Sequence, residues 1–107
     1  MNTREIGNKL ENWLIEYLKE LDPKTRKTNN SGAVSNNGDL MNKYFQIEAK
    51  HRNTKNLTIN MRIWNKLCNQ IPIGSLKTPL LVLRNENNET FAVLNFKDFM
   101  RILKNDK

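Results

Sequence analysis

The feature that most constrains the fold is a long helical stripe at the start of the chain. Between residues 2 and 21 the apolar side chains recur at the spacing of an amphipathic helix, at Ile6, Leu10, Trp13, Leu14, Tyr17, Leu18 and Leu21. Asp22 and Pro23 end the stripe, because proline disfavours a helical residue before it and cannot donate a backbone hydrogen bond. The sequence therefore predicts a helix over residues 2–21.

The pattern then changes to that of strands. Residues 24–38 are rich in Asn, Gly and basic side chains and predict a loop, with a short strand around residues 25–28. Residues 38–41 begin a strand that turns at Asn42 and Lys43. From Tyr44 to Lys50 the side chains alternate, with Phe45, Ile47 and Ala49 on one face and Tyr44, Gln46, Glu48 and Lys50 on the other.

The second half repeats helix, strands and helix. Thr58 is the expected N-cap of a helix whose apolar stripe runs from Ile59 to Ile71, before Pro72 stops it. The runs "PLLVLR" and "TFAVLN" are joined by "NENNE" and predict a hairpin. Asn95 can cap a last helix with Phe96, Phe99, Met100 and Leu103 on one side. We predict one α/β domain over residues 1–107, with a small mixed β-sheet flanked by helices.

Composition excludes several classes of protein. No apolar run is long enough to span a bilayer, and no signal-peptide core is visible, so we expect a cytoplasmic protein with no membrane partner. The single cysteine, Cys68, cannot form an internal disulfide and lacks the partners of a zinc site. We expect it to act as a small buried apolar group.

The net charge of +7 points to an anionic partner, most often a nucleic acid. An alternative is that the Lys- and Asn-rich composition reflects codon drift. The distribution of charge favours a partner, because residues 22–62 sum to +5 whereas residues 1–21 sum to −1.

This basic segment also contains acidic residues whose spacing could bring them together in one site. Glu48 and Lys50 project from the same strand face, and Asp39 joins them if its segment pairs with that strand. Two carboxylates and the Ala49 carbonyl are hard oxygen ligands of the kind that Mg²⁺ prefers. By itself the spacing is weak evidence, and a solvated face with a neighbouring Glu and Lys is the plain alternative.

Three further features accompany these acidic residues. Gly7 and Glu11 lie one turn apart on the first helix, at the border of its apolar stripe. Ser31 and Gly32 precede Asp39, and "EAKHR" continues the tripeptide into a basic pair.

Together these features resemble the PD-(D/E)XK nuclease superfamily, and most closely the Holliday-junction resolvases of archaeal type and their phage-encoded relatives. Gly38 stands where the family often has proline. The resemblance implies a restriction-endonuclease-like core and a homodimeric, Mg²⁺-dependent endonuclease acting on branched DNA, with Mn²⁺ as a substitute metal. It also implies a catalytic set of Glu11, Asp39, Glu48 and Lys50, a metal held by Asp39, Glu48, the Ala49 carbonyl and Glu11, and an auxiliary role for Ser31.

Other side chains are candidates for contact with DNA. We expect phosphate contacts from the residues that flank the acids, namely Lys24, Arg26, Lys27, Ser31, His51, Arg52 and Lys55. The alternative for the basic residues is a solvated face. Trp13, Tyr17 and Trp64 lie on apolar stripes, so we expect them in the core or a dimer interface, and Tyr44 either borders the site or covers the sheet edge.

Three other functions stay open at this point. A nuclease of the same superfamily can act instead on flaps, nicks or duplex DNA, because dimer geometry and loops choose the substrate. A non-catalytic basic adaptor would bind nucleic acid without a metal. An RNA-binding accessory protein rests on charge alone and ranks last.

Overall fold

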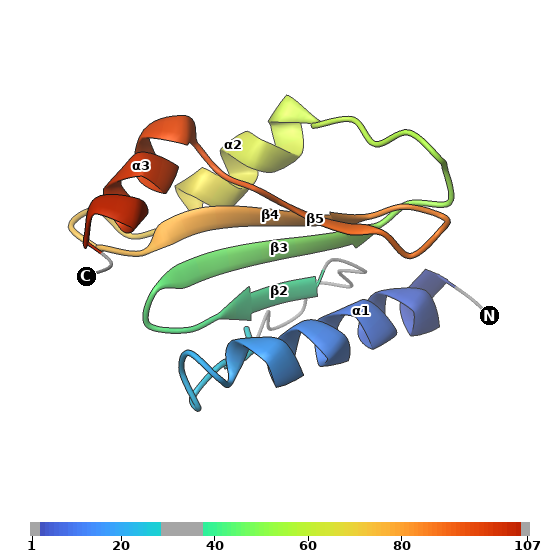
Figure 1. Cartoon of the computed structure of the whole chain (residues 1–107), viewed down its shortest axis with the longest axis horizontal. Coiled ribbons are helices and arrows are strands. Elements are labelled where there is room, and N and C mark those ends of the chain that lie inside the picture. Colours follow the sequence, from blue (N-terminus) through green and yellow to red (C-terminus); the bar gives the residue numbers. More distant parts are fainter. Residues whose placement is uncertain (1–2, 29–37, 106–107) are drawn as a thin grey trace.

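The chain folds as a small mixed α/β structure. The computed structural model describes residues 3–28 and 38–105, with side chains from residue 5 onward and, after the gap, from residue 40 onward. Within these residues five strands and three helices follow the order shown in Figure 1. They are α1 (Thr3–Leu18), β1 (Arg26–Lys27), β2 (Gly38–Met41), β3 (Phe45–His51), α2 (Met61–Asn69), β4 (Thr78–Arg84), β5 (Thr90–Val93) and α3 (Phe96–Asn105).

The strands form one open sheet in the order β1-β2-β3-β4-β5. Neighbouring strands are antiparallel except β3 and β4, which run parallel. Parallel neighbours need a crossover connection, and α2 supplies it between β3 and β4. The predicted mixed sheet between helices is confirmed. No described helix is long and apolar enough to cross a membrane.

The two faces of the sheet carry separate hydrophobic clusters. Beneath α1, Leu10 and Leu14 pack with Leu40, Ile47, Ala49, Leu80 and Val82. Beneath α2, Leu67 packs with Leu81 and Leu83. The central strand β4 therefore contributes apolar side chains to both faces, which explains the uninterrupted run "LLVL". Strand β3 is apolar only toward α1, as its alternation predicts.

Some element boundaries differ from the predictions. Helix α1 ends at Leu18 rather than Leu21, because the amides of Glu20 and Leu21 already donate to carbonyls three residues back. The prediction that Thr58 caps α2 is wrong. Asn60 is the cap, and its side chain accepts from the amides of Arg62 and Ile63. The Asn95 cap of α3 is confirmed by a 2.9 Å hydrogen bond from the Lys97 amide.

The expectation that Trp13 and Tyr17 lie in the core is also wrong. Trp13 and Tyr17 are both exposed, with ring centroids 4.6 Å apart, while Trp64 packs against the cluster beneath α2. A dimer interface over Trp13 and Tyr17 stays a prediction. Cys68, expected to be buried, is only partly so, and this burial raises the pKa of its thiol.

A buried polar junction joins the end of α1 to the turn between β2 and β3. Asp22 accepts hydrogen bonds from the backbone amides of Lys43 (2.8 Å) and Lys24 (3.0 Å). Asn42 donates to the Thr25 hydroxyl at 3.2 Å, and its side-chain oxygen accepts from the amides of Tyr44 and Phe45. These side chains hold the turn between β2 and β3 against the end of the preceding helix. The turn is centred on Lys43 and Tyr44, one residue later than predicted.

Acid should weaken this junction. The amides of Lys43 and then Lys24 donate to the Asp22 carboxylate and lower its pKa from the ordinary value of 3.8. Because folding lowers this pKa, the stabilisation is fully present above pH 3.8 and is lost as the pH falls through the lowered folded-state pKa. We predict that Asp22→Asn reduces the free energy of unfolding most at neutral pH, and that this difference shrinks on acidification. Urea unfolding of both proteins across the acid range measures it; a difference that stays constant with pH contradicts the prediction.

Candidate functional site

Glu48 and Lys50 form an ion pair on β3. The Lys50 Nζ lies 3.6 Å from the Glu48 Oε1, and the exposed fractions of the two side chains are 13% and 5%. Glu48 pairs in register with Leu81 of the cluster beneath α2, whereas Ala49 pairs with Val82 of the cluster beneath α1. The predicted sharing of one strand face by Glu48 and Lys50 is confirmed.

The register of the β2–β3 hairpin places Asp39 directly opposite Glu48, and Gly38 opposite Ala49. Directly opposed residues of an antiparallel pair belong to the same sheet face, with their Cβ atoms about 4.5–5.5 Å apart. The pairing of the Asp39 segment with β3, on which the site depends, is therefore present in the backbone. The Asp39 side chain lies outside the described part of the chain, so the meeting of the two carboxylates stays a prediction.

Glu11 approaches from the other side of the sheet. It lies on α1, is 8% exposed, and its Oε1 is 3.8 Å from the Nζ of Lys27. Lys27 pairs in register with Leu40, which belongs to the cluster beneath α1. Glu11 therefore lies by the β1 edge on the face opposite Glu48. Its participation in a shared site requires it to reach round that edge, and this too stays a prediction.

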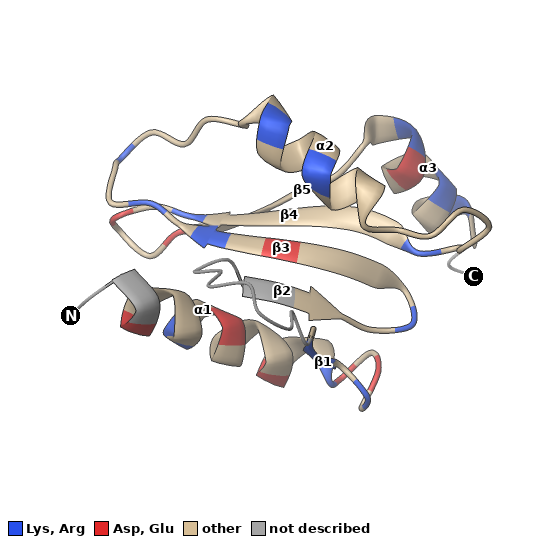
Figure 2. Ribbon diagram, turned by 180° about the vertical axis from the view of Figure 1, so that it is seen from behind, with Lys and Arg blue, Asp and Glu red and all other residues tan. Residues whose placement is uncertain are grey.

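The basic residues fall into two groups on either side of Glu48. Lys24, Arg26 and Lys27 are exposed at the β1 edge, and Arg26 pairs with Met41, which pairs with Gln46 near the start of β3. Arg52 and Lys55 are exposed and follow the other end of β3 in the chain. Figure 2 shows basic segments around that end of the strand. Gln46 and His51 are five residues apart, which corresponds to about 16 Å along a strand. Ser31 lies outside the described residues.

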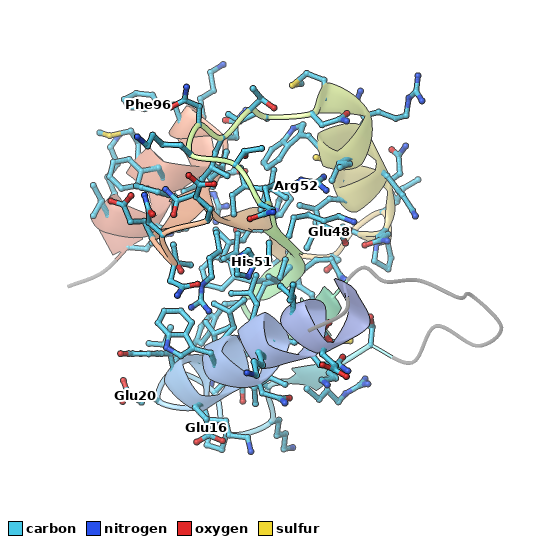
Figure 3. All side chains as sticks on the ribbon, turned by 90° about the vertical axis from the view of Figure 1, so that its right-hand side faces the viewer. Glu16, Glu20, Glu48, His51, Arg52 and Phe96 are labelled. Atoms are coloured by element: carbon cyan, nitrogen blue, oxygen red, sulfur yellow. The ribbon has the colours of Figure 1, made fainter. Side chains whose placement is uncertain are left out.

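His51 points away from Lys50. The two residues are adjacent on β3, and Figure 3 shows Glu48 and His51 on opposite sides of that strand. Burial lowers the pKa of His51 from its ordinary value of 6.5, and the neighbouring charge of Arg84 lowers it further. The neutral imidazole therefore dominates at neutral pH. It can exchange hydrogen bonds but adds no positive charge for phosphate.

Sequence patterns did not predict two contacts between a basic side chain and an aromatic ring. The Arg84 guanidinium carbon lies 4.6 Å from the centre of the Trp13 ring, and the Arg84 Nε donates to the Thr90 hydroxyl at 2.7 Å. Tyr44 is 45% exposed and lies just before β3, with the Lys43 Nζ 5.0 Å from its ring centre. The position of Trp13 on an apolar stripe does not predict its contact with Arg84, because Arg84 lies on β4, far along the chain.

The metal-binding capacity of the site depends on Asp39. Among the side chains that the structure describes, no three His, Cys, Asp or Glu residues come together as a potential metal site. The donor chemistry nevertheless fits a hard cation, since Glu48, Asp39 and a backbone carbonyl offer oxygen ligands only. The geometry thus contains one buried carboxylate, an adjacent lysine and a backbone position for a second carboxylate.

Comparison with known proteins gives no relative. No protein-family model matches the chain, and neither a curated protein nor a solved structure matches it.

The energetic coupling between Glu48 and Lys50 can be measured. Lys50→Met removes a cation beside a carboxylate that is almost fully buried, so we predict a loss of about 1–3 kcal/mol in the free energy of unfolding. Glu48→Gln combined with Lys50→Met should cost clearly less than the sum of the two single changes, because no buried charge then loses its partner. Urea unfolding of the four proteins completes the cycle. Strict additivity would show that the two side chains do not interact.

Proposed function

We propose that the chain is a metal-dependent DNA endonuclease of the PD-(D/E)XK type, most like a Holliday-junction resolvase. The observation that carries this proposal is the register that sets Asp39 opposite Glu48, on the strand from which Lys50 reaches the Glu48 carboxylate. An acid on one strand and the E-x-K tripeptide on the next is the arrangement that the resemblance implies. The order of α1, the β2–β3 hairpin, α2, the β4–β5 hairpin and α3 is consistent with a restriction-endonuclease-like core.

Burial separates this proposal from the plain alternative of a solvated Glu and Lys pair. A solvated pair would be exposed, but Glu48 is 4% exposed and its neighbour on the same face, Gln46, is 7% exposed. A buried carboxylate is costly to keep, and attraction to neighbouring groups such as Lys50 offsets that cost only in part. Such costs are characteristic of groups retained for chemistry rather than for stability.

The residues fit a divalent cation. Asp39, Glu48 and the Ala49 carbonyl would bind Mg²⁺ or Mn²⁺, with Glu11 supporting the site directly or through water. The bound ion would lower the pKa of a water molecule and offset charge on the phosphate. Lys50 would orient the attacking water, and its ion pair with Glu48 keeps its amine on the same face of the sheet as the Glu48 carboxylate. Hydrolysis would leave 5′-phosphate and 3′-hydroxyl ends, as the family resemblance implies.

DNA is the expected partner. The net charge of +7 favours association with a polyanion, and the two basic groups lie on both sides of Glu48. A phosphate backbone running past the site would contact Arg26 at one end, and Arg52 and Lys55 at the other. Two such sites in a homodimer would cut a branched substrate on two strands. We place this activity in the cytoplasm of a bacterial, archaeal or phage-infected cell.

Cleavage of a labelled four-way junction tests the proposal. We predict Mg²⁺-dependent cutting by the wild-type protein and a loss of at least about a hundredfold in Glu48→Ala and Lys50→Ala, because each removes a group from the reacting centre. Denaturing gel electrophoresis of flap, nicked and duplex substrates beside the junction shows which structure is preferred.

A matched control is Glu16→Ala. Glu16 is exposed, and Figure 3 shows it on the side of α1 that faces away from the sheet. This variant should cut at the wild-type rate. Absence of wild-type cleavage on every substrate, or equal cleavage by Glu48→Ala, would refute the catalytic proposal.

A non-catalytic adaptor is the second candidate, favoured by the net charge of +7 and by the exposed basic residues at both ends of β3. Metal titration separates the two candidates. A nuclease site should raise the thermal unfolding midpoint when Mg²⁺ or Mn²⁺ is added, and Glu48→Gln should abolish the rise. An adaptor should show no rise, and its salt-sensitive binding to DNA should be unchanged by Glu48→Gln. Scanning fluorimetry and binding measurements at several salt concentrations give both results.

A further inference from the structure

The last helix turns its apolar stripe to solvent. Phe96, Phe99, Met100 and Leu103 follow the spacing of a helix that packs by one face, and the sequence predicts burial for such a face. In the structure they are 72%, 41%, 37% and 52% exposed, and no residue of α3 is buried. Single exposed apolar residues are ordinary on a protein surface, but four along one helix mark an interaction site.

Polar side chains next to this stripe attach α3 to the domain. The Arg101 Nη2 donates to the Thr78 hydroxyl at 2.9 Å and to the Asp98 carboxylate at 3.2 Å. Asp98 is also close enough to Cys68 of α2 to contribute to the raised pKa of its thiol. Because Thr78 begins β4, these contacts tie α3 to the sheet through polar groups. The apolar stripe is therefore available without displacing the helix.

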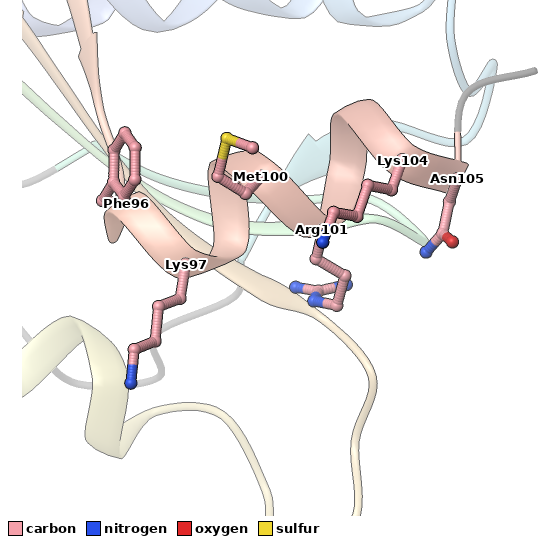
Figure 4. A pocket seen from close by; sticks show the side chains of 6 residues that line it. All are labelled: Phe96, Lys97, Met100, Arg101, Lys104 and Asn105. Atoms are coloured by element: carbon pink, nitrogen blue, oxygen red, sulfur yellow. The ribbon is translucent and has the colours of Figure 1, made fainter.

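A basic row runs beside the apolar stripe. Lys97, Arg101 and Lys104 are spaced like one helix face, and all three are exposed. An open groove of about 410 Å³ lies along this border, lined by Phe96, Lys97, Met100, Arg101, Lys104 and Asn105. Figure 4 shows the aromatic ring and the methionine side chain on the same stretch of helix as the three basic side chains. Among the described residues, neither Lys97 nor Lys104 forms an ion pair.

We propose that α3 docks an acidic peptide segment of a partner protein, with apolar side chains in the groove and carboxylates on the basic row. Charge complementarity selects this occupant. A second copy docked through the same face would bring the two basic rows of α3 together, and a nucleic acid would leave the apolar stripe uncovered. The inference does not rest on the proposed nuclease activity, since none of its residues belongs to the Glu48 site.

Selection from a library of random peptides displayed on phage tests the proposal. Binders are selected on the wild-type protein after removal of those that also bind Lys97→Glu combined with Lys104→Glu. We expect enriched peptides to combine Asp or Glu with aromatic or aliphatic residues. A synthetic copy, followed by fluorescence anisotropy, should bind about tenfold or more weakly to the charge-reversed variant and to Met100→Glu, and more weakly to both proteins as salt is raised.

Matched controls locate the site. Lys19→Glu combined with Lys66→Glu makes the same change in charge at exposed positions just after α1 and on α2, and this variant should bind as the wild type does. Enrichment of peptides without acidic residues, or of none, refutes the proposal. So do three other results: dimerisation in sedimentation experiments that Met100→Glu abolishes, binding to anionic phospholipid vesicles that the same variant abolishes, or displacement of the peptide by duplex DNA from α3.

Discussion

The arrangement of the candidate site depends on the buried polar junction between the end of α1 and the β2–β3 turn. The Asp22 carboxylate accepts a hydrogen bond from the amide of Lys43. The Asn42 side chain accepts from the amides of Tyr44 and Phe45 and donates to the Thr25 hydroxyl. These contacts determine where the hairpin turns and hence its register. A slip of one residue would put Leu40 opposite Glu48 and remove it from the cluster beneath α1. The same junction thus supports the core on one face and the pairing of Asp39 with Glu48 on the other.

The two faces of β3 carry different kinds of side chain, because α1 and α2 cover different parts of the sheet. The cluster beneath α1 includes residues of β2, β3 and β4, whereas the cluster beneath α2 draws its strand residues from β4 and β5. The face of β3 toward α2 therefore lies beside an apolar cluster without contributing to it, and its side chains Gln46 and Glu48 are polar and buried. A carboxylate in such a place is shielded from water on one side, which strengthens its interaction with any nearby cation.

Local patterns predicted most of the fold and a part of the site. Period-two alternation was enough to place Glu48 and Lys50 on one face, and turn-forming residues were enough to locate both hairpins. The cap of α2 was missed because Ile59 fits the apolar stripe in sequence, which favours Thr58 as the cap. In the structure Ile59 is exposed, and the stronger cap type, Asn60, begins the helix. The exposure of α3 could not be predicted, since periodicity defines an apolar face but not what covers it. The β2–β3 register was equally out of reach, because Asp22 and Thr25 control it from outside the hairpin.

The β2–β3 register also determines which charged residues are paired across the two strands. Like charges directly opposite each other across two antiparallel strands destabilise the pairing, so Asp39 and Glu48 are a poor choice for a sheet that serves stability alone. Lys50 supplies one positive charge against these two carboxylates, and Glu11 at the β1 edge is already beside Lys27. A divalent cation would bring the local charge from −1 to +1, which removes the repulsion and favours a phosphate. Under the proposed function, the acids and the lysine form one site, whose stability a bound divalent ion and a phosphate would complete.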